Sequence, residues 1–408
     1  MSYDGMLMGF LDNDTYKFSM GQVVLHHFSQ VEVEYEFRCR NKNIEMGAKL
    51  GQLISVIEEE IHKMKYLKLQ PKEKEYLKTK KFLKPDYIEF LENFRYNPEK
   101  HVRVYMEHGE LAITIKGNWV QTILYEVPIL AIVSELATKY NFKFENSDWK
   151  SISLKKLNEK VEYIKQHELY NKFKLADFGT RRRSSAENHD MVVRYLKEQL
   201  NVLGNGCFVG TSNVHLAMKY GINAIGTMAH EYLQAFQVLS PISTHLNDAL
   251  DCWSNTYDGL LGIALTDSIN MDSFLKIFSR SKSILFSGCR HDSGDPYIWG
   301  DKLINHYKKM NINPTTKQAV FSDGLTINKA FEILKYFDGQ IQCSFGIGTY
   351  LTNDIGIDPA NIVIKMVGCS SKYGGELFPV AKISDTPEKA ISRSQKYLEF
   401  LKELYNIN

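Results

Sequence analysis

Several features that would point to particular protein classes are scarce or missing in this chain of 408 residues. Its 50 lysines and arginines nearly balance its 48 aspartates and glutamates, so the net charge gives no reason to expect a nucleic acid partner. The six cysteines form no Cys-x-x-Cys pair and no Cys/His spacing typical of a zinc site. We therefore expect reduced thiols in a cytoplasmic protein that binds no nucleic acid.

Export and membrane signals are also missing. Residues 1–11 lack a charged region followed by a long apolar stretch and a small-residue cleavage site. No later apolar run approaches the roughly 20 residues of a membrane-spanning helix. We expect a protein that is neither exported nor bound to a membrane.

The first part of the chain has the pattern of an α+β unit. A helical mixture over residues 14–28 precedes a stretch in which Val31, Val33, Tyr35 and Phe37 alternate with charged residues. That period of two indicates a half-buried strand. A hairpin around Glu107-His108-Gly109-Glu110 and an apolar helix that begins near Pro128 are expected further on. We assign residues 1–140 to an N-terminal α+β domain that contributes to a dimer interface and to the site.

A different pattern begins near Lys172, where short apolar runs, polar loops and helices repeat. This repeat favours a parallel sheet with crossover helices. Because seven runs come close to eight and polar groups follow them, an irregular TIM-like α/β barrel is favoured over an open doubly wound sheet. We assign residues 141–385 to the barrel and residues 386–408 to a charged C-terminal helix without obvious chemistry. The seven runs cover residues 173–178, 206–210, 222–225, 260–265, 283–287, 319–321 and 340–345.

Two loops late in the barrel have the composition of a phosphate site. Gly346-Ile347-Gly348-Thr349 offers backbone N–H groups and a hydroxyl, although such glycines also serve simple turns. The preceding unit ends Phe321-Ser322-Asp323-Gly324. The loops after the last strands of a barrel frequently form a joint phosphate site. We therefore predict that the two loops bind one phosphate together.

Two further loops carry ionisable groups. Arg290 and Asp292 suit a sugar phosphate with Mg²⁺, whereas Asp295 is equally well explained as the cap of a helix that begins at Pro296. His230 follows Gly226-Thr227-Met228-Ala229 in the first turn of a helix. A histidine there is often an ordinary surface residue, but its place after a barrel strand makes a functional role equally plausible.

Taken in order from residue 12 to about 385, these motifs resemble the nicotinate phosphoribosyltransferase family. The resemblance implies transfer of phosphoribosyl from phosphoribosyl pyrophosphate to the ring nitrogen of nicotinate, giving nicotinate mononucleotide and pyrophosphate for NAD salvage. It also implies Mg²⁺ and coupled ATP hydrolysis through a phosphohistidine at His230. A carboxylate such as Glu231 would orient this histidine. The resemblance further implies a homodimer with shared active sites. The motifs are Asp14-Thr15-Tyr16-Lys17, Glu36-Phe37-Arg38, Phe178-Gly179-Thr180-Arg181-Arg182, Gly210-Thr211-Ser212-Asn213, Gly226-Thr227-Met228-Ala229-His230-Glu231, Arg290-His291-Asp292-Ser293-Gly294-Asp295 and Phe345-Gly346-Ile347-Gly348-Thr349.

The resemblance also implies roles for single residues. The pyridine ring would stack between Phe178 and Arg290, with Tyr16 from the partner subunit and Thr227 nearby. Arg181 would hold the donor phosphates. No residue is assigned as a direct metal ligand, and Arg182 and Arg183 have no assigned role. The ribose or Mg²⁺ would engage Asp292 and Asp267, and the 5′-phosphate would be received by Ser322, Asp323, Gly324, Gly348 and Thr349.

Two alternatives are open. A nicotinamide phosphoribosyltransferase shares these loops, but that family is expected to have an aspartate where this chain has Ser212. Unlike an aspartate, a serine can donate a hydrogen bond to the carboxylate of nicotinate. A catalytically silent barrel that binds NAD precursors would need the pocket but not His230, Asp292 or the arginines. We expect nicotinate as substrate.

Overall fold

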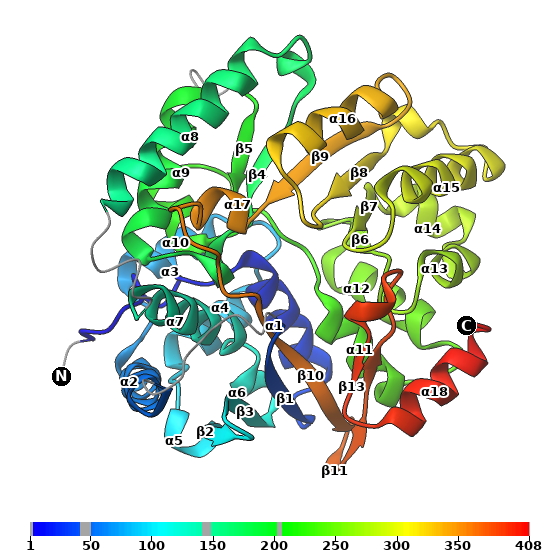
Figure 1. Cartoon of the computed structure of the whole chain (residues 1–408). Coiled ribbons are helices and arrows are strands. Elements are labelled where there is room, and N and C mark those ends of the chain that lie inside the picture. The colour runs from blue at the N-terminus through cyan, green and yellow to red at the C-terminus, as the bar shows by residue number, and fades with distance from the viewer. Residues whose placement is uncertain (1–2, 41–49, 141–147, 202–205, 408) are drawn as a thin grey trace.

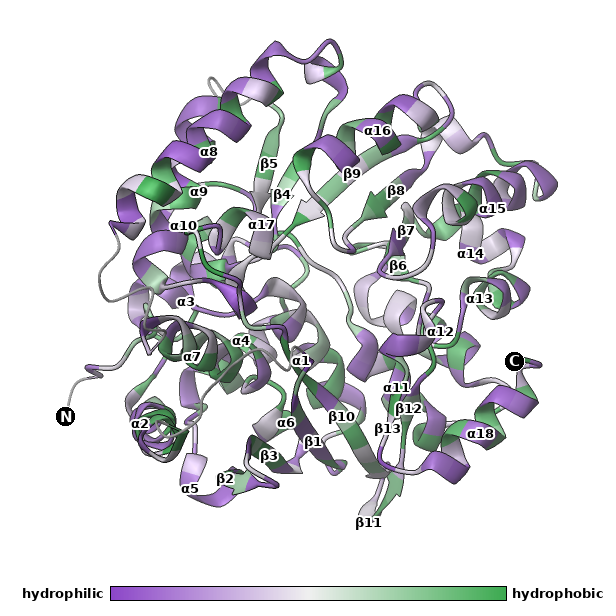
Figure 2. Ribbon diagram, viewed as in Figure 1, coloured by the Kyte–Doolittle hydropathy of each residue, from purple (hydrophilic) through white to green (hydrophobic). Residues whose placement is uncertain are grey.

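The computed structural model describes residues 3–40, 50–140, 148–201 and 206–407. Its elements form two main sheets, one parallel and one antiparallel, which lie in different parts of the molecule (Figure 1). Hydrophobic residues concentrate in β10 and in the strands of the parallel sheet, whereas the outer helices α8 (Trp149–Gln166) and α15 (Pro296–Lys309) are largely hydrophilic (Figure 2). The fold is therefore the predicted combination of an α+β region and an α/β region.

The antiparallel sheet has five strands in the order β11-β10-β1-β3-β2. β1 (Glu32–Cys39) alternates buried and half-buried positions, which confirms the strand predicted from its period of two. β2 (Val102–Glu107) and β3 (Glu110–Asn118) form the predicted hairpin, with positive φ at His108 and Gly109 in its turn. The helices of this region are α1 (Thr15–His27), α2 (Leu50–Lys63), α3 (Pro71–Lys78), α4 (Pro85–Asn93), α5 (Pro98–His101), α6 (Trp119–Thr122) and α7 (Glu126–Lys139).

Two strands of this sheet come from the far end of the chain. β10 (Ile362–Ser371) pairs with β1 in antiparallel register, and β11 (Gly374–Pro379) pairs with β10. The sheet thus draws strands from both sides of the predicted boundary at residue 140. Residues 141–147, which follow that boundary, lie outside the described residues, and the division into domains stays a prediction.

One stretch is longer and more apolar than the sequence analysis expected. Trp119–Lys139 spans 21 residues and contains an 18-residue window with a mean hydropathy of 1.5, which by length and composition is enough to cross a membrane. However, 89% of its window is buried inside the protein. The expectation that no apolar run reaches this length was wrong, and the stretch has the burial of a core helix.

The parallel sheet has six strands in the order β5-β4-β9-β8-β7-β6. These are β4 (Leu175–Asp177), β5 (Phe208–Thr211), β6 (Ile263–Leu265), β7 (Gly288–His291), β8 (Gln318–Phe321) and β9 (Gln342–Ile347). Besides α8 and α15, the helices of this half are α9 (Ala186–Leu200), α10 (Val214–Tyr220), α11 (His230–Leu239), α12 (His245–Tyr257), α13 (Met271–Ile277), α14 (Arg280–Leu285), α16 (Ile327–Phe337) and α17 (Thr349–Thr352).

Two of the seven predicted runs differ from this sheet. Residues 283–287 begin inside α14, whose N-cap is Ser279, and the strand starts only at Gly288. Short apolar runs do not distinguish a strand from a buried helix segment. The run 222–225 forms a single bridge, between Ala224 and Thr211, instead of a strand.

The segment after Ala224 joins the two edges of the parallel sheet. Ala224 lies beside Thr211 of β5, and the Thr227 hydroxyl donates to the Ile263 carbonyl of β6 over 2.8 Å. Between them, Gly226 has a φ of 156° and passes so close to α1 that an added Cβ would lie 3.0 Å from the Tyr16 nitrogen. An irregular barrel results, closed at this side by an extended segment.

The C-terminal part is not a single helix. A 3-10 turn over Pro387–Lys389 is followed by β13 (Ile391–Ser392), which pairs with β12 (Ala381–Lys382). The helix α18 (Gln395–Leu404) begins only after Ser394, whose side chain caps it. The helix predicted from residue 386 therefore starts nine residues later.

Candidate active site

A cavity of about 980 Å³ opens beside the carboxyl ends of the parallel strands and is also lined by residues of β10. Polar loops that are far apart in the sequence meet there, as expected for parallel strands. Thr227 and Asp267 are absent from its wall among the residues that the structure describes. The predicted residues that line it are Tyr16, Phe178, Arg181, Ser212, His230, Arg290, Asp292, Ser322, Asp323, Gly324, Gly348 and Thr349.

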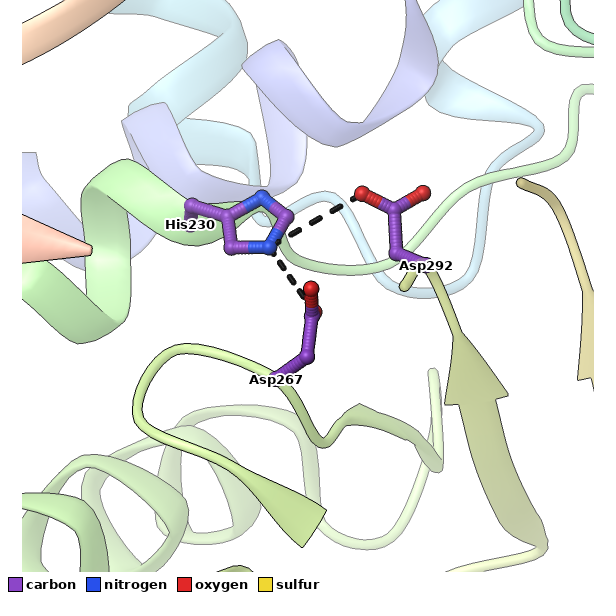
Figure 3. A group of neighbouring side chains, drawn as sticks. All are labelled: His230, Asp267 and Asp292. Atoms are coloured by element: carbon purple, nitrogen blue, oxygen red, sulfur yellow. Dashed lines mark hydrogen bonds and ion pairs between the residues drawn. The ribbon is translucent and has the colours of Figure 1, made fainter. Parts of the chain in front are cut away.

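His230 lies in the cavity wall between two aspartates, of which Asp292 also lines the cavity. Asp267 and Asp292 both point toward the imidazole of His230 (Figure 3). Its Nε2 lies 2.8 Å from Asp267 Oδ1 and 3.8 Å from Asp292 Oδ2. Asp267 lies behind His230, fully buried, where its Oδ2 also accepts from Ser293 Oγ at 2.6 Å and pairs with Lys382 Nζ at 2.9 Å.

The environment keeps this imidazole neutral. Burial, helped by the Lys382 ammonium, lowers the pKa of His230 to about 4, against the opposing effect of Asp267 and Asp292. A neutral imidazole that donates from Nε2 to Asp267 retains its lone pair on Nδ1. The expected orienting carboxylate, Glu231, points elsewhere: its Oε2 lies 2.6 Å from Lys17 Nζ. Asp267 orients the ring instead.

One histidine and two aspartates form a candidate donor set for a metal ion. His230, Asp267 and Asp292 bring their ligand atoms within 4.8 Å of one another. However, Mg²⁺ favours oxygen ligands, and the oxygens of Asp267 are already engaged by His230, Ser293 and Lys382. Asp292, whose side chain is 31% exposed, remains the carboxylate that fits an ion held mainly by substrate phosphates.

The loop after β4 is fixed from below by Asp177, which is fully buried. Asp177 accepts from Gly179 N at 2.9 Å, Thr211 Oγ1 at 2.6 Å and His189 Nε2 at 2.7 Å. The Phe178 ring packs directly over Gly346, where an added Cβ would lie 2.3 Å from the ring. Gly346, predicted as part of a phosphate loop, thus gives room to the aromatic ring.

Both loops predicted to bind phosphate line the cavity, and a lysine from outside them reaches one of the loops. Ser322 Oγ donates to Asp292 Oδ1 over 3.0 Å, and Asp323 pairs with Lys389. Lys389 also donates to the Asp292 carbonyl at 3.0 Å. The C-terminal segment, which was expected to carry no chemistry, therefore contributes a charged group to the site.

The cavity is also lined by Tyr16, Ser212 and Asp14. Ser212 Oγ donates to Asp14 Oδ1 over 2.7 Å, and burial raises the pKa of Asp14. The Tyr16 hydroxyl is buried and has no hydrogen-bond partner within the described chain. Tyr16 lines the cavity of its own chain, and its contribution to the site of a partner subunit stays a prediction.

The residues without assigned roles now have structural explanations. Arg183 is fully buried and forms two 2.8 Å hydrogen bonds with Asp12. Arg182 lines the cavity, and burial lowers its pKa to about 10. Asp295 accepts from Tyr297 N and Ile298 N, so it caps α15.

Sequence reasoning missed most of the cations in the cavity wall. They occur singly, in segments without a glycine-rich loop or a recognised motif, and no local pattern marked them. Lys365, on β10, is the most perturbed, since burial lowers its pKa to about 7. The missed cations that line the cavity are Arg40, Lys156, Lys365, Lys382 and Lys389.

Comparison with known proteins gives consistent matches. Residues 173–408 match the nicotinate phosphoribosyltransferase (NAPRTase) family model, and residues 11–134 match the N-terminal domain model of that family. "Nicotinate phosphoribosyltransferase 2" of Pseudomonas aeruginosa is 43% identical over 98% of each chain. "Nicotinate phosphoribosyltransferase" of Bordetella pertussis is 41% identical over 98% of this chain and 96% of its own. A solved nicotinate phosphoribosyltransferase from Vibrio cholerae has a TM-score of 0.91 at 35% identity, covering 100% of this chain and 95% of its own.

Proposed function

The chain belongs to the nicotinate phosphoribosyltransferase family, and from this premise we propose that it catalyses ATP-coupled transfer of phosphoribosyl to nicotinate in NAD salvage. The observation that carries the coupling is the neutral His230, held by Asp267 in the wall of the cavity that also contains Asp292 and the phosphate loops. A histidine prepared in this way can accept a phosphoryl group at neutral pH.

In the transfer step, the nicotinate ring lies against Phe178 and Arg290, and its nitrogen lone pair attacks C1 of the donor. The bond from C1 to pyrophosphate breaks, and pyrophosphate leaves with its electron pair. No general base is needed, because the ring nitrogen carries no proton. Arg181 stabilises the leaving anion, and Asp292 lies close to the sugar, where positive charge develops.

Mg²⁺, when bound with the donor, would neutralise negative charge on the departing pyrophosphate, and Asp292 is the residue that would hold it. The 5′-phosphate lies against Ser322, Asp323, Gly324, Gly348 and Thr349. Lys389, paired with Asp323, adds a positive charge beside this phosphate.

In the coupling step, the lone pair of His230 Nδ1 attacks the γ-phosphorus of ATP, and ADP departs. Asp267 stabilises the ring by accepting a hydrogen bond from Nε2–H. Water later cleaves the phosphorus–nitrogen bond and releases inorganic phosphate. His230→Ala is expected to remove ATP stimulation while leaving a basal transfer, and acid-labile phosphate on another residue would contradict this role.

Nicotinate is the proposed substrate because the cavity wall has Ser212 where a nicotinamide-specific enzyme is expected to have an aspartate. The Ser212 hydroxyl, which here donates to Asp14, would rotate to donate to the carboxylate of nicotinate. A steady-state assay with nicotinate, nicotinamide and quinolinate, each with and without ATP, tests both substrate and coupling. Turnover of nicotinamide alone would overturn the proposal, and absence of any turnover would favour the catalytically silent barrel.

We further propose a cytoplasmic homodimer with shared sites. Mixed dimers of Tyr16→Ala and Asp292→Ala subunits test this. Recovery of activity supports sharing, and no recovery in confirmed heterodimers means that each chain uses its own Tyr16.

A further inference from the structure

Behind the cavity wall, one buried lysine joins three helices. Lys17 Nζ lies 2.6 Å from Glu126 Oε2 and 2.6 Å from Glu231 Oε2, and its side chain is fully buried. Lys17 belongs to α1, Glu126 is the first residue of α7, and Glu231 is the second residue of α11. We call Lys17, Glu126 and Glu231 the Lys17 bridge.

Both glutamates of the Lys17 bridge lie next to a residue of the proposed reaction. Glu231 directly follows His230 at the start of α11. Glu126 Oε1 lies 3.6 Å from Arg181 Nη1. The ammonium itself lies 5.7 Å from the centre of the Tyr16 ring. Glu126, Glu231 and Arg181 line the cavity, whereas Lys17 lies behind it.

Glu126 keeps its negative charge, because Lys17, with Lys365 and Arg181, lowers its pKa against the effect of burial. Burial and the neighbouring Glu126 raise the pKa of Glu231 to about 7, so the charge of Glu231 depends on the Lys17 ammonium. The Arg181 contact is the loosest, since its distance is 3.6 Å and its side chain is 37% exposed, whereas both Lys17 contacts are short and buried. Arg181 can therefore exchange Glu126 for the anionic donor, and Glu126 is then left with Lys17 alone.

We propose that Lys17 is a positioning residue that couples donor binding at Arg181 to the phosphoryl site at His230. This inference rests on the proposed ATP coupling. When Arg181 turns toward the donor phosphates, Glu126 draws more strongly on the shared ammonium, and the Lys17–Glu231 contact that anchors the start of α11 changes. Such coupling is reciprocal, so phosphorylation of His230 must change donor affinity by the same factor.

One further observation supports a movable anchor. Glu231 Oε1 is buried and has no hydrogen-bond partner in the described part of the chain. A buried carboxylate oxygen without a partner is costly, so the Glu231 side chain gains a contact in any state in which a donor reaches it. Glu231 therefore has an unused acceptor for a second arrangement.

The test compares the KM for phosphoribosyl pyrophosphate with and without ATP. In the wild type we expect the ratio of these values to be at least about fivefold, the lower end of typical coupling. Lys17→Met and Glu231→Gln should reduce it to below about twofold. Lys17→Arg keeps the charge but not the compact ammonium, so it should retain an intermediate ratio.

Lys317→Met is the matched control. Lys317 is a buried lysine that donates to the carbonyls of Ile284 and Phe286, at the opposite ends of the strands from the cavity. It should lower the melting temperature and leave the KM ratio unchanged. If Lys17 had only a structural role, Lys17→Met would lower kcat by the same factor with and without ATP.

The outcomes separate the inference from the proposed function. A wild type without any ATP effect overturns the proposed coupling itself. A wild type with coupling, but with a Lys17→Met variant that keeps the ratio, overturns the Lys17 bridge alone. If Lys17→Met does not fold, the Glu231→Gln variant provides the test, because Lys17 then still pairs with Glu126 and its charge stays balanced. An unchanged KM ratio in Glu231→Gln also refutes the inference.

Discussion

Replacing Asp267 by asparagine separates the orientation of His230 from the chemistry of the substrates. In the wild type, one oxygen of Asp267 accepts from His230 Nε2 at 2.8 Å, and the other pairs with Lys382 at 2.9 Å. A hydrogen bond to a charged group contributes about 1.5–3 kcal/mol, which corresponds to about 10–100-fold in rate. Asp267→Asn is therefore expected to slow phosphorylation of His230 by about 10–100-fold.

The same substitution leaves the Lys382 ammonium, which is 4% exposed as a residue, without its carboxylate. Breaking a buried ion pair costs about 3–5 kcal/mol of unfolding free energy. Adding Lys382→Met should restore much of this stability but none of the phosphorylation rate. The double variant thus distinguishes a misfolded site from a misoriented imidazole.

The assay is rapid-quench incorporation of the γ-phosphoryl of labelled ATP into acid-labile phosphohistidine, with denaturant unfolding measured on the same samples. Asp272→Asn is the control, because Asp272 pairs with Lys302 at 2.7 Å while its side chain is 62% exposed. That variant should match the wild type. Phosphorylation of Asp267→Asn at the wild-type rate would refute the role of Asp267 in orienting the ring.

Three more predictions follow from the site. Ser212→Asp places a second carboxylate beside Asp14, so kcat/KM for nicotinate should fall by about 10–100-fold in the steady-state assay; an unchanged value would contradict the selectivity argument. Arg183→Met leaves Asp12 buried without its partner, and denaturant unfolding should show a loss of about 3–5 kcal/mol, with the KM values of the surviving fold unchanged. The pKa of His230 is about 4, against an ordinary value of 6.5, so the phosphorylation rate should stay constant from about pH 8 to pH 5. The stability that the neutral ring contributes should be present above pH 6.5 and disappear as pH falls toward about 4. A phosphorylation rate that halves near pH 6.5 would contradict burial of the ring.

The sequence predicted the loops of the site better than their connections. Phe178 could be found because it follows an apolar run that forms β4, and the carboxyl ends of parallel strands converge. Arg290 and His230 line the same cavity although the runs before them, 283–287 and 222–225, are not strands of the sheet. The partner of His230 could not be found in the same way. Glu231 is adjacent in sequence, but it turns to Lys17, while the ring is held by Asp267 from the loop after β6. Long-range pairings of this kind leave no periodicity.

The fold was predictable to a similar extent. Alternation identified β1, and the hairpin turn identified β2 and β3, because both signals are local. The pairing of β10 with β1 joins residues more than three hundred positions apart and depends on the whole chain. Lys365 was missed for this reason, since nothing near it in the sequence shows that β10 faces the cavity.

The position of β10 makes the barrel an insertion within the antiparallel sheet. A fragment that ends near residue 140 would expose the edge of β1 that β10 covers, so it should not fold alone and should aggregate through that edge. Two fragments cut near the same point should instead associate, because the second carries the missing strand. An exchange of domains in this enzyme must therefore replace the N-terminal strands and β10 together.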